Sequence, residues 1–349
     1  MSVLSSTYVQ CEVIQRMLDD MFVSGMQPLE SMPFLDAVIA TQNANGISQT
    51  VSDGSGKVRN VKVVYEQRLL ESAATVGSGA RSCSTEVQTF NDYANYTIDP
   101  AVWIKGEEFF NVVDLATVCT EDVQSMIARK INKVIDVIER RVATKTAAEL
   151  VTLYGKWSTT AATAYTVTSD ELVVAAYVSA ATKVIDYSSA VAIDSALAMT
   201  GYNNSIIVGG NALVDYMKFV NHGCCAANGA DVLAIANDYG KAVMFDKRVM
   251  TALGDNSKSI AFQPGSLALI HYNEAPQVPA IGANYAKFRV NSPRTGLPID
   301  IVMKDDCGHI SVIGYANTLL VGLPVDMFAV GDEYRGVKFV NKIKVTNPA

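Results

Sequence analysis

The chain has 349 residues, of which 49% are hydrophobic and 18% charged, which is enough to bury one large core or two modest ones. Its formal net charge of −7 argues against a broad basic surface of the kind that holds nucleic-acid phosphates. The six cysteines include one adjacent pair, Cys224 and Cys225, and form no C-x-x-C motif, which favours a reduced, intracellular chain.

No membrane or secretory segment is expected. The N-terminus lacks a basic region followed by an apolar run. Two stretches without charge, 195–214 and 307–325, approach membrane-spanning length, but both contain polar and helix-breaking residues. We therefore expect a soluble protein whose apolar residues lie in a core or in contacts with other chains.

Residues 1–45 predict an N-terminal arm. An amphipathic helix is expected within residues 1–23, and Pro28 and Pro33 then break the pattern. The following residues, 34–40, predict a brief extended or helical piece. A short helix before a breaker needs a surface to pack on, either the chain's own core or a neighbour.

Residues 46–100 predict a long hairpin. A turn signal at 51–57 lies between strand-like segments, and side chains alternate over 61–66 and again over 85–90. Large apolar residues are few, and a free two-stranded ribbon is marginal in water. Two interpretations follow: a loosely packed surface hairpin, or an extension whose partner is another molecule.

The second interpretation predicts contact residues. If the hairpin lies on a neighbouring chain, its charged side chains should meet partners there, and apolar contact should supply most of the stabilisation because surface ion pairs contribute only about 0–1 kcal/mol each. The expected inter-subunit contact residues are Asp53, Lys57, Arg59, Lys62 and Arg68.

One long helix is predicted over residues 120–154. Its apolar residues recur at steps of three and four, and neither Pro nor Gly interrupts before Gly155. Ile131 and Ile138 are expected on its buried stripe. At about 1.5 Å per residue the helix would be roughly 50 Å long, which favours a strut across which separate layers lie. The alternative is simply the longest helix of an ordinary α+β domain.

Beyond the helix, residues 161–290 predict a compact α/β unit. A helix is expected from Ser169 to about residue 185, a strand at 205–208, and a helix capped by Asn211. Further elements are expected after that helix: a helix at 231–237 and strands at 242–245, 259–262 and 267–271. The last part of the chain, residues 291–349, reads as successive strands.

No catalytic, cofactor or metal site is predicted. His222 with Cys224 and Cys225 matches no common zinc spacing. Gly209 and Gly210 end a strand before a helix, where a phosphate could bind, but the dinucleotide fingerprint is missing and a plain tight turn is the better interpretation. Nothing in the sequence assembles a nucleophile, a base and an electrostatic stabiliser, so the chain is not expected to be an enzyme.

Taken in order, these parts resemble the major capsid protein of tailed double-stranded DNA bacteriophages, whose fold is shared with encapsulins. The most family-like phrases are WIKGEE at 103–108, SIIVGGNAL at 205–213 and QPGSLALI at 263–270. The resemblance covers nearly the whole chain in the order of its elements and depends on no short diagnostic motif.

The resemblance implies an α+β capsid fold with five parts. They are an N-terminal arm (1–45), an extended loop (46–100), a peripheral domain (101–160) with a spine helix (120–154), an axial domain (161–290) and returning peripheral strands (291–349). It also implies hexamers and pentamers of this chain in an icosahedral virion capsid, assembled in the host cytoplasm. Scaffold, portal and decoration proteins are the other partners it implies. Because the chain begins directly with the arm, the scaffold is expected to be separate or absent.

Three functions stay open on sequence alone. The first is a structural shell subunit around packaged DNA, and the second is an encapsulin-like compartment shell with the same fold and a different cargo. The third, from another class, is an α/β enzyme that holds a phosphate at Gly209–Gly210. Electron microscopy of the expressed protein separates the shells from the enzyme, and neighbouring genes separate the two shells.

Overall fold

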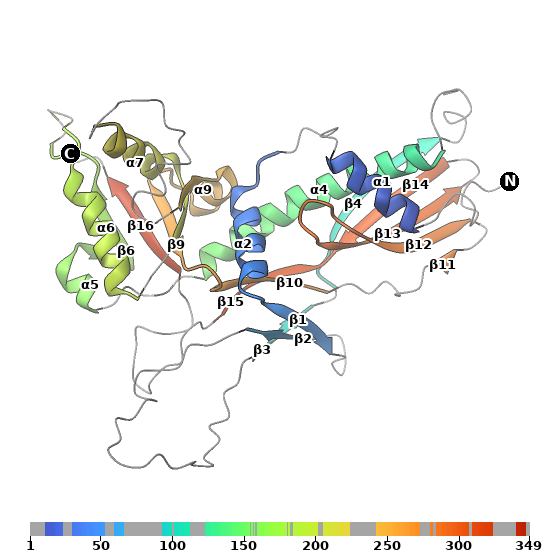
Figure 1. The fold of residues 1–349 in the computed structure, drawn as a ribbon, viewed down its shortest axis with the longest axis horizontal. Coiled ribbons are helices and arrows are strands. Elements are labelled where there is room, and N and C mark those ends of the chain that lie inside the picture. Colours follow the sequence, from blue (N-terminus) through green and yellow to red (C-terminus); the bar gives the residue numbers. More distant parts are fainter. Residues whose placement is uncertain are drawn as a thin grey trace, which may run out of the picture.

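In the computed structural model of the protein, the other layers are arranged around one 30-residue helix, α4 (Val123–Thr152). At 1.5 Å per residue it is about 45 Å long. It packs against α1 (Cys11–Val23) in one half of the body and against α9 (Lys247–Leu253) and β15 (Thr318–Gly322) in the other, as Figure 1 shows. The predicted long helix is therefore confirmed, with bounds of Val123–Thr152 where 120–154 was expected.

The structure describes most of the chain. The described residues are 11–23, 30–52, 59–65, 93–99, 101–111, 123–153, 155, 157, 159–179, 181, 184–201, 205–223, 242–272, 280–281, 284–306, 309–323 and 340–346. The tip of the predicted hairpin and the predicted helix at 231–237 lie outside them.

The apolar stripe of α4 is buried as predicted. Ile131 has no exposed surface and Ile138 is 1% exposed. Eight further apolar side chains of the helix are buried with them: Ile127, Ala128, Val134, Ile135, Val142, Ala143, Ala147 and Leu150. This spacing of three and four residues gives the helix one face on which sheets and helices can pack.

A five-stranded antiparallel sheet covers one side of α4. Its order is β11-β12-β13-β14-β4, with β11 at Ala280–Ile281, β12 at Tyr285–Asn291, β13 at Pro298–Asp306, β14 at His309–Ala316 and β4 at Ile104–Asn111. Gly106 and Gly314 lie opposite each other in the β4–β14 register. A Cβ at Gly314 would lie 2.6 Å from Cγ1 of Val134, and one at Gly106 would lie 3.0 Å from Cγ1 of Ile138. The two glycines therefore let the helix approach the sheet backbone.

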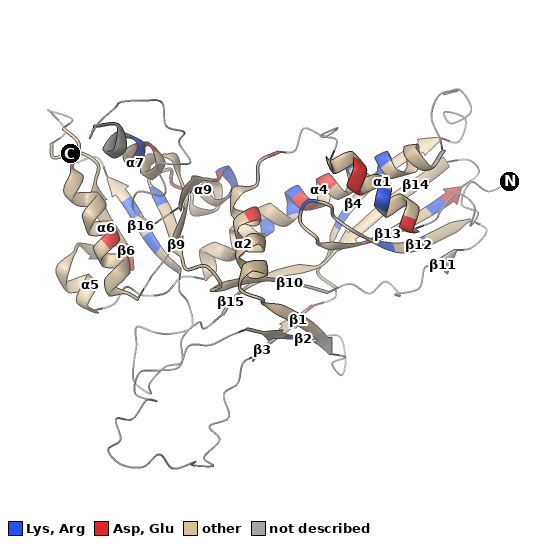
Figure 2. Cartoon of the chain, in the orientation of Figure 1, with Lys and Arg blue, Asp and Glu red and all other residues tan. Residues whose placement is uncertain are grey.

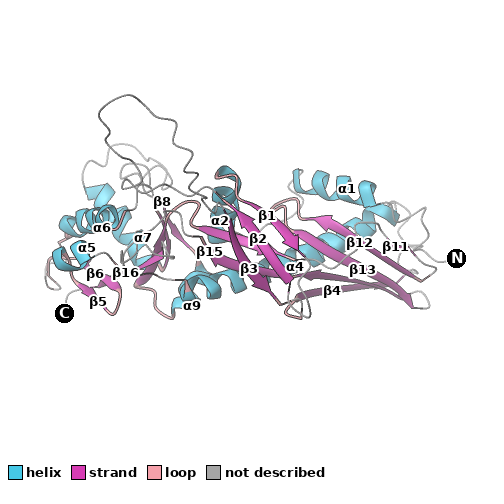
Figure 3. Cartoon of the chain, turned by 90° about the horizontal axis from the view of Figure 1, so that it is seen from below, coloured by secondary structure: helices cyan, strands magenta, loops and turns pink. Residues whose placement is uncertain are grey.

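A second, six-stranded sheet lies in the other half of the body. Its order is β5-β6-β16-β9-β7-β8, with β5 at Val167–Thr168, β6 at Glu171–Ala175, β16 at Val340–Thr346, β9 at Lys258–Phe262, β7 at Ile206–Gly209 and β8 at Ala242–Phe245. Three helices, α5 (Thr159–Ala164), α6 (Tyr187–Met199) and α7 (Asn211–Gly223), contribute to the apolar cluster on this sheet, which includes Trp157, Ile193 and Leu213. Seen from below in Figure 3, they lie at the end of the body opposite α1.

Two small sheets join these halves. One is the pair β10 (Leu267–His271) and β15. The other has the order β1-β2-β3, with β1 at Ser48–Ser52, β2 at Arg59–Val64 and β3 at Tyr93–Ile98. The helix α2 (Pro33–Ala44) packs on β10 and on α4, so the predicted brief segment at 34–40 is helical and longer than expected. The mixed α+β fold class is confirmed.

Three sequence expectations differ from the structure. The segment expected to begin a helix at Ser169 is instead the β5–β6 hairpin, in which Ser169 and Asp170 have φ angles of 51° and 62°. The helix of this region, α6, begins only at Tyr187, where the Asp186 carboxylate accepts the amide of Ser188. The β-branched pair within 171–175 and the short run favour a strand over a helix.

The other two differences concern which layer a strand joins. Residues 340–346 were expected among the returning peripheral strands, but β16 pairs with β6 and β9 in the six-stranded sheet. Residues 285–291 were expected in the axial unit, but β12 pairs with β13 in the five-stranded sheet. Alternating polarity predicts which side chains of a strand share a face, but it does not predict which strand lies beside it. The sequence therefore could not assign these two strands to a sheet.

Replacing Ile131 by Asp should strongly destabilise the chain. Ile131 has no exposed surface, so the variant buries a carboxylate without a partner, and we expect a loss of roughly 3 kcal/mol or more in the free energy of unfolding. The matched control is Ala148→Asp on the exposed side of the same helix, which should change it by about 0.5 kcal/mol. Denaturant unfolding measures both, and equal losses would show that the buried face is misassigned.

Candidate functional site

The turn at Gly209 and Gly210 is closed to a phosphate. The amide of Gly210 donates to the carbonyl of Lys258 at 2.9 Å, and the amide of Asn211 donates to Oδ1 of Asn256 at 2.7 Å. A Cβ at Gly210 would lie 1.9 Å from the carbonyl oxygen of Asn256. Asn256 therefore takes the position at the start of α7 that an anion would need. The two glycines allow the backbone of this turn to approach the backbone of residues 256–259 closely. This is the tight turn that the sequence favoured.

The candidate metal residues are not assembled in the described part of the chain. Cys224, Cys225 and Cys307 lie outside the described residues, as does the side chain of His222. Within the described ranges, no three His, Cys, Asp or Glu side chains are placed to hold a metal ion. The remaining candidate site is therefore the predicted contact surface at the hairpin.

The base of the hairpin belongs to the chain's own core. In β2 and the residue after it, the side chains of Val61, Val63 and Tyr65 are at most 5% exposed. They pack with Ile47 and Ile98. On the other side of this cluster lie Ala268, Ile270, Val321 and Leu323 from β10, β15 and the residue after it. The expectation that the strands lack a partner of their own is therefore wrong for residues 59–65, because β3 and the β10–β15 pair supply one.

Only part of the predicted contact set lies in the described chain. Asp53, Lys57 and Arg68 lie outside the described residues. Arg59 opens β2 and pairs with Ile98, and its side chain is likewise outside the description. Lys62 is exposed, and its ammonium lies 3.9 Å from the centre of the Tyr93 ring on the neighbouring strand. Lys62 therefore already has an aromatic partner within its own sheet.

Side chains rather than strands close the outer edge of β10. Oε1 of Gln42 in α2 accepts the amide of Leu269 at 3.0 Å, and Oε1 of Gln49 in β1 accepts the amide of His271 at 3.1 Å. Nε2 of Gln49 also lies 2.6 Å from Nε2 of the His271 ring. Two glutamines thus satisfy two outward amides of β10 and connect this strand to α2 and β1.

The outer edge of β15 is closed in the same way by α4. Lys145 donates to the carbonyl of Thr318, and Oε2 of Glu149 accepts the amide of Leu320 at 2.8 Å. The two side chains are themselves an ion pair at 3.0 Å, one helical turn apart. The two-stranded sheet is therefore held between the long helix and the base of the hairpin by side-chain hydrogen bonds.

Burial shifts the pKa of two groups at this junction. Desolvation, reinforced by the nearby charge of Arg289, lowers the pKa of His271 to about 4, because the buried ring resists protonation. Burial, reinforced by Tyr65, raises the pKa of Tyr96, whose hydroxyl donates to the carbonyl of Gly322 at 2.7 Å. Both groups are neutral at pH 7, as hydrogen bonding in this half-buried position requires.

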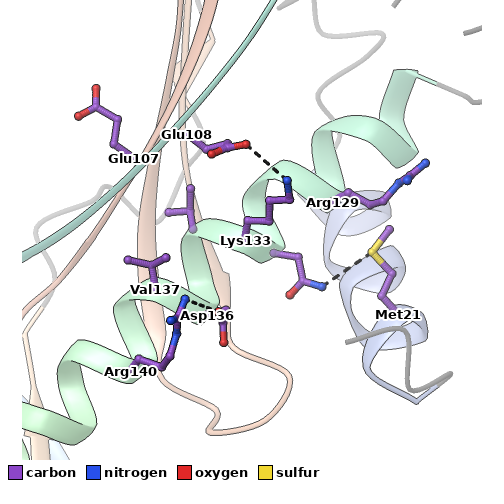
Figure 4. A pocket seen from close by; sticks show the side chains of 10 residues that line it. Met21, Glu107, Glu108, Arg129, Lys133, Asp136, Val137 and Arg140 are labelled. Atoms are coloured by element: carbon purple, nitrogen blue, oxygen red, sulfur yellow. Dashed lines mark hydrogen bonds and ion pairs between the residues drawn. The ribbon is translucent and has the colours of Figure 1, made fainter. Parts of the chain in front are cut away.

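A groove missed by the sequence reading lies between α1, α4 and β4 (Figure 4). Its volume is about 480 Å³. Glu108 pairs with Lys130 at 2.8 Å and with Lys133 at 3.6 Å, and these cations lower the pKa of the Glu108 carboxyl. Asp136 pairs with Arg140 at 2.7 Å. The charges along the groove are thus largely paired within the chain. The groove could not be predicted from one sequence, because it depends on ion pairs between a strand and a helix that is distant along the chain.

Exposed apolar residues gather at the far end of the six-stranded sheet. Val178 and Val184 are 66% and 55% exposed, and their backbones are joined by a 2.8 Å hydrogen bond. Tyr187 and Val191, one turn apart on α6, are 45% and 58% exposed. Figure 2 shows little charge on α5 and α6. Among the helices that the structure describes, none is long and apolar enough to cross a membrane.

Comparisons with known proteins find structural similarity to phage proteins and to an encapsulin. No family model matches the chain, and no curated protein matches it. Among solved structures, the chain is similar to one from the capsid of cyanophage P-SCSP1u, with 10% identity over 85% of both chains and a TM-score of 0.42. It is similar to the SrpI encapsulin of Synechococcus elongatus, with 9% identity over 91% of both and a TM-score of 0.40. A phage-related protein of Bordetella bronchiseptica shows 8% identity over 97% of both and a TM-score of 0.45.

The burial of residues 61–65 predicts their behaviour in solution. Their amides should be protected from hydrogen exchange in the isolated chain, because the strand lies between β1 and β3 over the β10–β15 pair. Exchange followed by mass spectrometry at low protein concentration measures this. Exchange there as fast as in an unstructured peptide would mean that these residues are not part of the chain's own core.

The lowered pKa of His271 predicts acid sensitivity. The unfolded chain takes up this proton near pH 6.5, whereas the folded chain takes it up near pH 4. Stability from the neutral ring is therefore complete above pH 6.5 and is lost as pH falls toward 4. His271→Gln should lose less of its melting temperature between pH 7 and 4.5 than the unchanged protein. The matched control, His309→Gln on an exposed residue, should retain the full loss. An equal loss in all three would contradict this role.

Proposed function

We propose that this chain is the structural subunit of a closed shell, a major capsid protein that forms hexamers and pentamers of an icosahedral virion around packaged double-stranded DNA. The observation that carries the proposal is the arrangement of parts around α4. Along the chain, two helices, a hairpin base, the long helix, an α/β layer and the strands β12, β13 and β14 follow one another, which is the order that the sequence resemblance implies; the last strand, β16, differs by joining the α/β layer.

The elongated arrangement supports a role in assembly. The five-stranded and six-stranded sheets lie toward opposite ends of the body (Figure 1), so each end offers separate surfaces for neighbours. At one end, the exposed apolar residues of the α6 region would lose water in a contact with another subunit. This fits a chain whose working partners are copies of itself.

The hairpin is proposed to have two roles. Its base is part of the chain's own core, so it fixes where the remainder starts. The parts proposed to reach a neighbour are then two segments beyond the base: residues 53–58, between β1 and β2, with Asp53 and Lys57, and residues 66–92, between β2 and β3, with Arg68. Lys62 is the member of that set with an aromatic partner in its own sheet, and we expect it to contribute least to the contact.

Two alternatives differ in their support. An encapsulin-like compartment uses the same kind of shell, and the content of particles isolated from their natural source, DNA or a protein cargo, distinguishes it. The α/β enzyme with a phosphate at Gly209–Gly210 is not favoured, because Asn256 and Lys258 already bind the amides such a phosphate would need. The proposal assigns no catalytic step to the chain.

The proposal predicts that the purified chain forms rings or closed shells. Light scattering and negative-stain electron microscopy measure this directly. The double variant Lys57→Glu with Arg68→Glu should reduce the yield of closed particles severalfold while leaving the melting temperature of the subunit unchanged. A matched control, Lys247→Glu with Lys304→Glu, reverses two exposed charges outside the hairpin and should assemble normally.

A monodisperse monomer that persists at high protein concentration would contradict the shell proposal itself. Normal assembly of the hairpin variant beside a normal control would contradict only the contact role of Lys57 and Arg68. The two results are therefore separable.

A further inference from the structure

A compact turn between β12 and β13 is built around one hydroxyl. Oγ of Ser292 accepts the amides of Arg294 at 3.2 Å and Thr295 at 3.1 Å. The carbonyl of Ser292 accepts the amide of Gly296 at 2.8 Å, and Gly296 has a φ of 69°, which glycine adopts without strain. The carbonyl of Leu297 closes the turn by accepting the amide of Ser292 at 2.8 Å. We call residues 292–297 the 292–297 turn.

A buried carboxylate of α4 lies against this turn. Glu139 is 2% exposed and is one of three buried polar residues of α4, with Asn132 and Thr146, beside its buried apolar residues. Its Oε1 accepts hydrogen bonds from the hydroxyls of Thr295, at 2.8 Å, and Ser292. The same Ser292 oxygen that organises the turn therefore donates its own proton to Glu139. Breaking the contact with Glu139 would loosen both the turn and its attachment to α4.

The same turn holds the N-terminal helices. The guanidinium of Arg294 makes two hydrogen bonds to the carboxylate of Asp36 in α2, at 3.2 and 2.7 Å, and a third to the carbonyl of Glu30 at 2.8 Å. One residue before the turn, the side chain of Gln15 in α1 bonds both the amide and the carbonyl of Asn291, at 2.9 and 3.0 Å. Three helices thus meet at one short segment.

We propose that the 292–297 turn is a latch for the N-terminal helices whose closure is controlled by a proton on Glu139. With Glu139 protonated, the turn is closed on α4 and holds α2 through Arg294. With Glu139 ionised, opening of the turn admits water to the carboxylate, so opening becomes easier and α2 is released from Arg294 more often.

The electrostatics of the site give the direction of this control. Burial raises the pKa of Glu139, and Asp136 on the same helix adds to the rise, while the two hydroxyls and Arg294 of the turn act against it. From α2, Asp36 faces Arg294 from the other side and offsets part of its charge. A carboxyl group with a raised pKa in the closed state favours closure at low pH. Closure is strongest below the ordinary pKa near 4.5 and weakens as pH rises through the raised value.

Hydrogen exchange tests the latch in the full-length chain. We would measure the amides of Thr295 and Gly296 in the turn, and of Asp36 in α2, from pH 4.5 to 9, dividing out the intrinsic pH dependence of exchange. Protection should fall with rising pH, by up to about tenfold for each pH unit between the ordinary and the raised pKa. In Glu139→Gln, which cannot ionise, corrected protection should be constant with pH.

Two further variants separate the latch from a merely structural contact. In Arg294→Gln, the turn should keep its pH dependence while Asp36 loses it, because the link to α2 is removed. In Asp136→Asn, which removes an adjacent carboxylate paired with Arg140, the pH dependence of the turn and of Asp36 should both persist and move to lower pH, because Asp136 adds to the rise in the pKa of Glu139. If Glu139→Gln does not fold, Thr295→Val replaces it: removing one donor to the ionised form raises the pKa further, so the loss of protection should move to higher pH.

Three results would overturn the proposal. The first is corrected protection that does not change with pH in the unchanged protein. The second is a pH dependence that survives in Glu139→Gln, or a loss of protection that occurs at the same pH in Thr295→Val as in the unchanged protein. The third is a response of Asp36 that persists in Arg294→Gln. None of these depends on whether the chain forms a shell.

Discussion

The contact between α4 and the five-stranded sheet is the constraint on which the other layers depend. A helix can lie close to a sheet only where the side chains of the sheet leave room. Here Gly106 of β4 and Gly314 of β14 are paired on adjacent strands and lie against Val134 and Ile138 of α4. Any larger residue at Gly314 would meet Val134 at less than van der Waals distance. This close approach fixes α4 against β4 and β14. The residues at its other end, Lys145 and Glu149, can then reach the edge of β15.

Polar side chains add to the packing where the other layers meet α4 and one another. Gln42, Gln49 and the Lys145–Glu149 pair close the edges of the β10–β15 sheet, and Arg294 connects a turn of the five-stranded sheet to α2. Each such bond contributes only about 1 kcal/mol, whereas an unpaired buried backbone group would cost more. The bonds therefore specify where the layers meet, and the apolar clusters beneath them supply most of the stability.

Sequence reasoning predicted the elements whose pattern is long or strongly periodic. The stripe of α4 and the strands at 242–245 and 267–271 follow from local spacing alone, and all are present. The helix expected from Ser169 was wrong because the short apolar run within 171–175 fits the spacing of a strand as well as that of a helix. The left-handed turn at Ser169 and Asp170 makes this segment a hairpin. The partner of the hairpin base could not be predicted either, since Val61 and Val63 meet residues about two hundred positions later. Glu139 interrupts an apolar stripe, yet only the structure places the hydroxyls that make it tolerable.

A joint made of side chains has a consequence for the proposed assembly. In the proposed assembly, rings of five and rings of six would place one chain in different angular relations to its neighbours, and the subunit would then have to tolerate small rotations between its layers. A continuous sheet resists such rotation because every ladder hydrogen bond along it would be strained together. The hairpin base and the β10–β15 pair are separate sheets instead, joined by their shared apolar cluster and by hydrogen bonds of Gln49 and of the hydroxyl of Tyr96. These hydrogen bonds can lengthen, and the side chains can change rotamer, one at a time. The division into several sheets around one rigid helix therefore combines a fixed support, α4, with adjustable connections to the layer that carries the hairpin.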